Sequence, residues 1–276
     1  MTAPPTTRPP ARSVAFRAVR AGLLAVLLGT LMLLTFQRKI LFPAPPPRAL
    51  SQRFGALVEG RSPGGRRVAA LWAPRPGASA TTWTAVYFHG NGMQLADCAE
   101  LAPTLHAEGF NLFAVEYPGY GPLAGDDPSE AALVETSAAA VGLLRERFQV
   151  PTERTLLLGQ SLGTGIAVQL AARGMGARVV LLTPYRSITA VAGELFPWLP
   201  VRWLVRDRFD SESLAPSVTV PVQVVHGTDD EVIPFAHGEA LARLFPRGTL
   251  VRVPGGHHND LWSEHPGAIS TALRAR

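Results

Sequence analysis

The chain has 276 residues, of which 47% are hydrophobic and 17% are charged. This composition excludes a disordered chain, and the length suits one large α/β domain with a sizeable buried core. The net charge of +5 belongs to the N-terminal arm, because eight of the 26 basic residues and none of the 21 acidic residues precede Glu59. The rest of the chain is mildly acidic, which argues against a nucleic-acid-binding surface. Cys98 is the only cysteine, so no intramolecular disulfide is possible.

Residues 1–20 form a basic tail, and the uncharged apolar stretch 21–36 follows it. Extended to residue 42, this stretch reaches the roughly 20 residues that a spanning helix needs. We expect 21–42 to be an uncleaved, single-pass membrane anchor. The apolar stretch ends in Thr-Phe-Gln-Arg-Lys, which lacks the small residues of a signal-peptide cleavage site. The upstream basic residues favour a cytoplasmic N-terminus and a folded domain on the non-cytoplasmic side. Residues 43–50 are a Pro-rich spacer.

The segment 51–276 alternates strand-like and helix-like stretches, and we expect it to form one domain. The predicted strands are 67–72, 84–88, 110–115, 155–158, 179–182, 220–225 and 250–253, and the predicted helices are 95–108, 127–148, 162–173, 236–245 and 260–273. Such alternation, with continuous apolar strands, indicates an α/β fold with a mainly parallel central sheet and helices on both faces.

Residues 185–216 interrupt this alternation and contain several aromatic and proline residues. A long insertion near the ends of strands is typical of a lid or a pocket wall. We therefore predict a small lid insertion here, while a surface excursion that packs on the core is the alternative.

Gly159-Gln160-Ser161-Leu162-Gly163 matches G-x-S-x-G between a predicted strand and a predicted helix. This is the context of a nucleophile elbow, in which a sharp turn exposes the serine hydroxyl at a helix N-terminus. We predict Ser161 as the nucleophile. In this arrangement one oxyanion donor is the backbone N–H after the nucleophile, which here is Leu162.

A serine nucleophile needs a base that an acid orients. In the nucleophile-elbow arrangement, the acid and the base both follow the serine in the chain. Asp229, Asp230 and Glu231 follow one late strand and compete for the role of the acid. His257 and His258 follow the last strand, and either could be the base.

Five motifs in order, HGN, EYPGYG, GQSLG, HGTDDEVIP and HHND, span the chain from about Thr84 to its C-terminus. Together with the apolar N-terminal segment, they resemble the membrane-anchored branch of α/β hydrolases that includes protein-depalmitoylating enzymes and serine-aminopeptidase-like bacterial proteins. The resemblance implies an α/β-hydrolase fold, with Asp230 as the acid ahead of Asp229. It also implies His258 as the base, although His257 stands where the family usually has glycine. The backbone N–H of Asn91 is implied as the second oxyanion donor, with Gly92 as the alternative.

These residues predict a serine hydrolase that cleaves a carboxylic ester or thioester with a small-molecule or lipid-like acyl group. A serine peptidase with the same triad is an alternative, and a non-catalytic membrane-tethered binding protein is an alternative of another class. We expect no cofactor and no metal, since His257, His258 and Asp260 have no recognised ligand spacing. The sequence indicates no oligomeric state.

Overall fold

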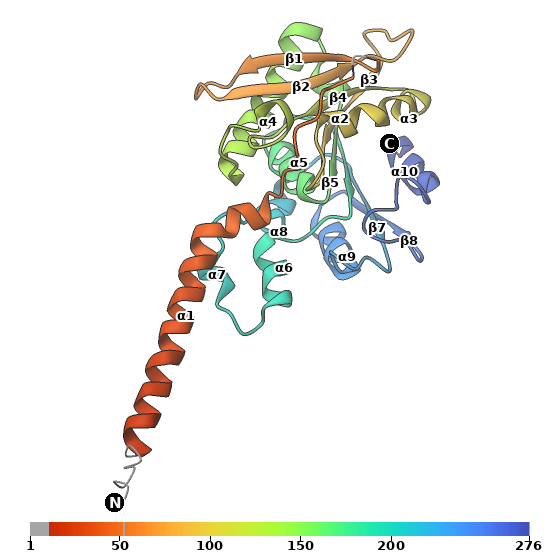
Figure 1. Cartoon of the computed structure of the whole chain (residues 1–276). Coiled ribbons are helices and arrows are strands. Elements are labelled where there is room, and N and C mark those ends of the chain that lie inside the picture. The colour runs from red at the N-terminus through yellow and green to blue at the C-terminus, as the bar shows by residue number, and fades with distance from the viewer. Residues whose placement is uncertain (1–10, 52, 276) are drawn as a thin grey trace, which may run out of the picture.

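A computed structural model describes residues 11–51 and 53–275, and its centre is one eight-stranded sheet (Figure 1). The strand order is β1-β2-β4-β3-β5-β6-β7-β8. The strands from β3 onward run parallel, and β2 runs antiparallel to both of its neighbours, β1 and β4. The mainly parallel sheet is therefore confirmed. The strands are β1 (Ala56–Arg61), β2 (Arg67–Ala73), β3 (Trp83–Phe88), β4 (Phe110–Val115), β5 (Thr155–Gln160), β6 (Arg178–Leu182), β7 (Val222–Gly227) and β8 (Gly248–Val253).

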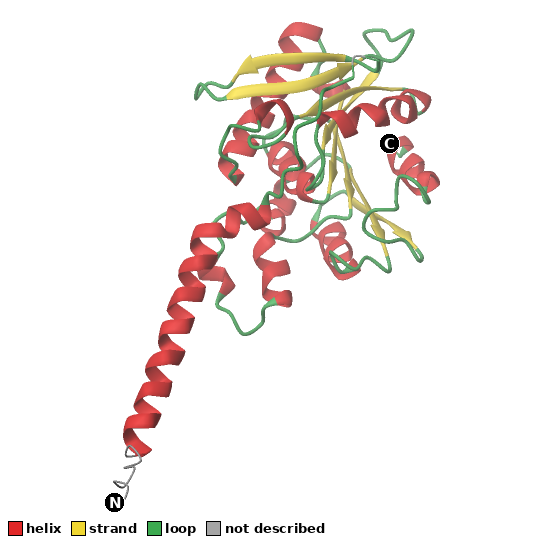
Figure 2. Cartoon of the chain, viewed as in Figure 1, coloured by secondary structure: helices red, strands yellow, loops and turns green. Residues whose placement is uncertain are grey.

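Helices cover both faces of this sheet (Figure 2). On one face α4, α5 and α9 bury residues such as Leu133, Ile166 and Leu241. On the other face α3 and α10 bury Leu105 and Ile269. The helices are α1 (Ala11–Leu41), α2 (Leu95–Cys98), α3 (Ala102–Ala107), α4 (Glu130–Phe148), α5 (Leu162–Ala172), α6 (Ile188–Leu195), α7 (Val201–Leu204), α8 (Ser211–Leu214), α9 (Phe235–Leu244) and α10 (Pro266–Arg274), with single 3₁₀ turns at Ala99–Leu101, Gly121–Leu123, Thr152–Arg154 and Ala215–Ser217.

Three local features differ from the sequence prediction. The strand β1 was missed because it is an edge strand with Val58 as its only buried residue, so it carries little apolar pattern. The predicted helix 95–108 is divided into α2, a 3₁₀ turn and α3, where Pro103 lies in the first turn of α3 and cannot donate a backbone hydrogen bond. The last helix begins at Pro266, since proline suits the first helical position, and not at residue 260.

The helix α1 leaves the domain as a long arm, with its C-terminal end at the domain and its N-terminal end away from it (Figure 1). Among the described residues, we find no individual helix with both the length and the apolar character to cross a bilayer. The segments Arg20–Met32 and Leu34–Leu41 of α1 meet these criteria jointly, although they are bent by 45° relative to each other. The predicted insertion 185–216 forms α6, α7 and α8, and α7 lies against the C-terminal end of α1.

The C-terminal end of α1 is fixed to the domain by a buried carboxylate. Asp207, which is 3% exposed, accepts hydrogen bonds from Nε of Arg38 at 2.8 Å and from its Nη2 at 3.3 Å. The same carboxylate accepts the backbone N–H of Glu130 at the start of α4, at 2.9 Å. The buried ring of Phe42 then packs edge-on against Phe209, with 6.3 Å between ring centroids. This end of α1 is therefore part of the folded domain.

We predict that Asp207→Ala lowers the free energy of unfolding by about 2 kcal/mol, because it removes charge-assisted hydrogen bonds and leaves a buried N–H without its acceptor. The matched control is Asp126→Ala, whose pair with Arg67 is solvent-exposed and is worth less than about 1 kcal/mol. Urea unfolding of the full chain in nonionic detergent, followed by tryptophan fluorescence, measures both. Equal losses in the two variants would contradict the structural role of Asp207.

Candidate active site

Ser161 lies at a strained turn between β5 and α5. Its φ of 48° and ψ of −116° are unusual for a residue with a side chain. The turn is possible because glycine flanks it on both sides: a Cβ at Gly159 would lie 2.6 Å from the carbonyl oxygen of Gly163, and a Cβ at Gly163 would collide with the carbonyl of Phe88. The two glycines of the motif thus allow strand, turn and helix to pack at this distance.

The structure brings Ser161, His258 and Asp230 into one hydrogen-bonded chain. Nε2 of His258 lies 3.0 Å from Oγ of Ser161, and Nδ1 of His258 lies 2.8 Å from Oδ2 of Asp230. Asp230 and His258 are both buried, and they follow the neighbouring strands β7 and β8. Since a carboxylate only accepts hydrogen bonds, Nδ1 carries the ring proton and Nε2 can accept the proton of the serine.

Asp230 has an environment that stabilises its ionised form. Its Oδ1 accepts the backbone N–H groups of Val232 at 2.9 Å and Ile233 at 2.7 Å. Nε2 of the buried His226 lies 3.3 Å from Oδ2 and 2.9 Å from the carbonyl of Ile233. Burial alone would raise the pKa of Asp230, but hydrogen bonds from His226 and His258 outweigh it and hold the pKa well below its usual range. The carboxylate is therefore charged at neutral pH.

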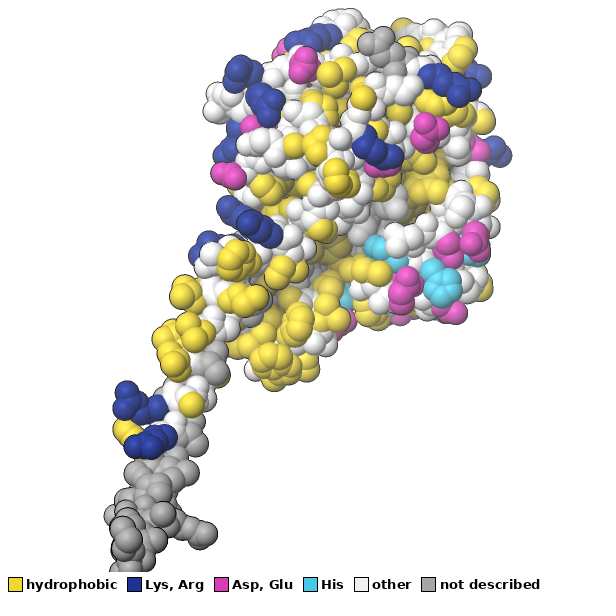
Figure 3. Space-filling view, in the orientation of Figure 1, with side chains coloured by type: hydrophobic (Ala, Val, Ile, Leu, Met, Phe, Trp, Pro, Cys, Tyr) yellow, Lys and Arg dark blue, Asp and Glu magenta, His cyan; other side chains and the backbone are white. Residues whose placement is uncertain are grey.

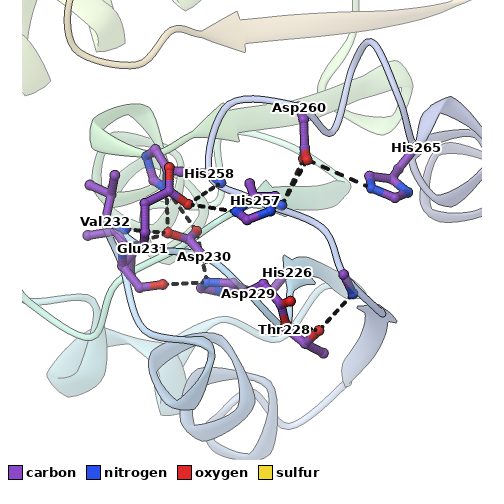
Figure 4. Close-up of polar contacts among 12 residues, drawn as sticks. His226, Thr228, Asp229, Asp230, Glu231, Val232, His257, His258, Asp260 and His265 are labelled. Atoms are coloured by element: carbon purple, nitrogen blue, oxygen red, sulfur yellow. Dashed lines mark hydrogen bonds and ion pairs between the residues drawn. The ribbon is translucent and has the colours of Figure 1, made fainter.

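The competing acids and the competing histidine lie outside this chain of hydrogen bonds (Figure 4). Oδ1 of Asp229 accepts the hydroxyl of Thr228 at 2.8 Å. Glu231 lies 3.2 Å from Nδ1 of His257, whose side chain is 56% exposed. The hydrogen bond that the ring of His257 donates to Glu231 raises the pKa of His257, with further contributions from the negative charges of Asp260 and Asp229. His257 is thus a surface residue that pairs with an acid.

The loop that contains Asn91 lies beside Ser161, since a Cβ at Gly90 would be 3.4 Å from the Cβ of Ser161. The fully buried His89 braces this loop: its Nε2 lies 2.9 Å from Oε1 of Glu116, and its ring stacks on Tyr117. The hydroxyl of Tyr117 donates to the carbonyl of His89 at 2.9 Å. These buried polar contacts therefore fix the position of the loop.

Asn91 itself is held at its side chain. The hydroxyl of Tyr120 donates to Oδ1 of Asn91 at 3.0 Å, and burial raises the pKa of Tyr120, so the phenol stays protonated. Glu116, Tyr117 and Tyr120 belong to the EYPGYG turn. In the sequence this motif contributes to the family resemblance, but the sequence alone gives its residues no role in the site. The available signal was the position of Glu116 directly after the predicted apolar strand 110–115, because an acid that becomes buried there needs partners.

Leu162, the other predicted donor, is the first residue of α5. Its N–H therefore has no partner within the helix and points out of the helix N-terminus, beside Ser161. The carbonyl of Leu162 accepts the hydroxyl of Tyr185 at 3.1 Å, which links this helix end to the start of the 185–216 segment.

Among the described residues, one group has metal-ligand spacing: Asp260, Glu264 and His265 offer atoms within 4.8 Å of one another. It differs from the set His257, His258 and Asp260, which has no recognised ligand spacing in the sequence. The two carboxylate oxygens of Asp260 already accept the backbone N–H of His257, at 2.9 Å and 3.0 Å. The group stands at the surface and shares no residue with the chain of hydrogen bonds at Ser161.

This chain is similar in sequence to known proteins. A family model described as serine aminopeptidase, S33 matches residues 79–207. The α/β hydrolase domain-containing protein aho-3 of Caenorhabditis elegans is 39% identical over 184 residues, which are 65% of this chain and 53% of the worm protein. The human α/β hydrolase domain-containing protein 17C is 38% identical over 186 residues, or 67% of this chain and 55% of the human protein. The family model, these relatives and the fold together support an α/β-hydrolase family for this chain. It matches only a little more than half the length of these curated relatives.

Solved structures agree with this fold. The esterase Pf2001 of Pyrococcus furiosus superposes with a TM-score of 0.66 at 15% identity, over 83% of this chain and 96% of that structure. Est1E of Butyrivibrio proteoclasticus, solved with ferulic acid, superposes with a TM-score of 0.61 at 18% identity, over 79% of this chain and 96% of that structure. At such identities the likeness supports the fold alone.

We predict that the imidazole pKa of His257 lies above the usual histidine value and falls in Glu231→Gln. The charged carboxylate of Glu231 favours the protonated ring, and the neutral amide does not. An NMR pH titration of the histidine ring signals measures this pKa. Glu264→Gln is the control, because Glu264 makes no contact with His257 that would shift it. An unchanged pKa in Glu231→Gln would contradict the pairing.

Proposed function

We propose that this protein is a serine hydrolase that cleaves a carboxylic ester or thioester with a lipophilic acyl group. The observation that carries the proposal is the hydrogen-bonded chain from Asp230 through His258 to Ser161, at a strained turn that opens a helix. This arrangement supplies the nucleophile, base and orienting acid that acyl transfer needs. The α/β-hydrolase fold suits a small-molecule acyl substrate.

In the proposed reaction, Oγ of Ser161 attacks the substrate carbonyl carbon while Nε2 of His258 takes the hydroxyl proton. The charged Asp230 stabilises the resulting imidazolium and keeps the ring oriented. The carbonyl oxygen becomes an oxyanion, which accepts hydrogen bonds from the backbone N–H groups of Asn91 and Leu162. The bond to the alcohol or thiol then breaks, and the leaving group takes the proton from His258.

An acyl-enzyme ester on Ser161 remains after the leaving group departs. Water attacks this ester, and His258 accepts a proton from the water. The second tetrahedral oxyanion collapses, which releases the carboxylic acid and returns the proton to Ser161. No cofactor is needed for these steps.

We predict that Ser161→Ala, Asp230→Asn and His258→Ala each lower kcat by about 10⁴-fold or more, because each removes one member of a unit that acts together. The matched controls are the neighbouring residues of the same type, Asp229→Asn and His257→Ala, which should stay within about threefold of the parent protein. Hydrolysis of p-nitrophenyl esters by the full chain in detergent measures all five variants.

The alternatives have separate outcomes in the same assay. Faster turnover of aminoacyl amides than of esters and thioesters would favour the serine peptidase. Folded protein with no Ser161-dependent turnover, and no labelling by a fluorophosphonate probe, would overturn the enzyme and favour the binding protein. Equal losses in Asp229→Asn and Asp230→Asn would contradict the assignment of the acid.

We also infer that residues 21–42, which include most of α1, are an uncleaved membrane anchor and that 185–216 acts as a lid over the site. The side chains of Val26, Leu27 and Met32 are each more than 60% exposed, and so many apolar groups on one helix suit a lipid surrounding. The basic residues of the tail 1–20, before the apolar stretch 21–36, favour placement of the domain on the non-cytoplasmic side.

Sodium carbonate extraction of cell membranes should leave the full chain in the membrane fraction. Leu27→Arg should shift a large part of it to the soluble fraction, since an arginine near the centre of a span costs roughly 3 kcal/mol. Ser217→Arg, on an exposed turn of the domain, is the control and should not change the fractionation. Extraction of the unchanged chain by carbonate would contradict the anchor.

A further inference from the structure

A pocket of about 260 Å³ lies between the C-terminal end of α1 and the α6–α7 segment. The helix α1 contributes Gln37, Ile40 and Leu41, and residues 188–205 contribute nine further side chains, all of them apolar. Gln37 and Asn91 are the only polar side chains of this lining. Water gains few hydrogen bonds in such a space, and an apolar group is favoured there.

One end of the pocket is the loop beside Ser161. Asn91 lines the pocket, and its Nδ2 donates to the carbonyl of Leu41 at 2.8 Å. The preceding residue, Gly90, lies against the Cβ of Ser161. When the carbonyl group of an acyl substrate lies at Ser161, the pocket is therefore the apolar space next to it.

Hydrogen bonds join the two walls of the pocket, the end of α1 and the segment that follows α6. Nε2 of Gln37 donates to the carbonyl of Leu204 at 3.3 Å, and the backbone N–H of Arg206 donates to Oε1 of Gln37 at 3.0 Å. The bidentate contact of Arg38 with Asp207 is next to them. These contacts hold the last turns of α1 against the insertion, so α1 is a fixed wall of this space.

We propose that this pocket binds the hydrocarbon chain of the substrate's acyl group, and that α1 is a wall of the substrate site as well as an anchor. The proposal rests on the proposed function and deepens it by naming an unbranched alkyl chain as the occupant. Methylene groups gain from burial against the apolar lining, while the charged or polar leaving group has no partner there.

The outer side of the pocket adjoins the apolar surface of the molecule. Leu195 and Phe196 line the pocket and are 64% and 45% exposed. Trp198 and Trp203 are exposed on the same α6–α7 segment. Figure 3 shows hydrophobic side chains gathered over this segment and along the adjoining part of α1. An alkyl chain that leaves a bilayer beside α1 therefore meets apolar surface along its way to the pocket.

The test is the ratio of kcat/KM for p-nitrophenyl octanoate to that for the acetate, measured with the full chain in detergent. We expect kcat/KM to rise about threefold per methylene until the pocket is filled. Ala192→Phe fills the pocket from α6 and should lower the ratio at least tenfold, and Ile40→Ala removes part of the α1 wall and should lower it about threefold. The ratio compares two esters on the same protein, so loss of folded protein does not change it.

Matched controls lie on the same two helices and outside the lining. Ala190→Phe on α6 and Leu31→Ala on α1 should leave the ratio unchanged. Unchanged ratios in both Ala192→Phe and Ile40→Ala, with Ser161-dependent turnover intact, would overturn the pocket assignment alone. Absence of any Ser161-dependent turnover would instead overturn the proposed function, and with it the inference that rests on it.

A second measurement locates the chain directly. A long-chain alkyl fluorophosphonate with a terminal diazirine should attach to Ser161 and, after irradiation, cross-link to peptides that contain residues 37–41 or 188–205. Cross-links from labelled Ser161 that fall only on other segments would overturn the inference.

Discussion

The strained turn at Ser161 is the constraint on which the rest of the site depends. A residue with φ of 48° at the end of a buried strand persists only where its surroundings compensate for the strain. Gly159 and Gly163 remove the side chains that would collide with the backbone, and α5 begins at the next residue. The turn raises the hydroxyl of Ser161 above the carboxyl ends of the parallel strands, where the loops after β7 and β8 bring Asp230 and His258 to it.

Buried polar groups give this site its rigidity on two sides. On one side, His226 and two backbone N–H groups hold the carboxylate of Asp230. On the other side, Glu116 and His89 hold the loop that carries Asn91. Each group is buried with partners, and a buried charge without partners would be costly. The acid and the predicted oxyanion donor are therefore positioned before any substrate arrives.

The N-terminal helix is joined to this arrangement and is not a loose tether. Arg38 and Gln37 fasten the end of α1 to the 185–216 segment, and the carbonyl of Leu41 accepts a hydrogen bond from Asn91. The end of α1 and the loop beside Ser161 are thus in direct contact through this hydrogen bond. This continuity links the membrane-facing part of the chain, as we propose it, to the chemistry.

The sequence by itself determined the features that depend on neighbouring residues. The alternation of continuous apolar strands with helix-like stretches indicated the mainly parallel sheet. The glycines around Ser161 indicated the turn, because a sharp turn is a local constraint of the backbone. The local pattern left three consecutive acids and two adjacent histidines open, since adjacent residues differ only in the direction of their side chains. The motif resemblance favoured Asp230 and His258, and the tertiary structure shows that these two meet. It also revealed β1, whose exposed edge carries little pattern, and the wall that α1 makes with α6 and α7, because contacts between segments some 160 residues apart leave no local signal.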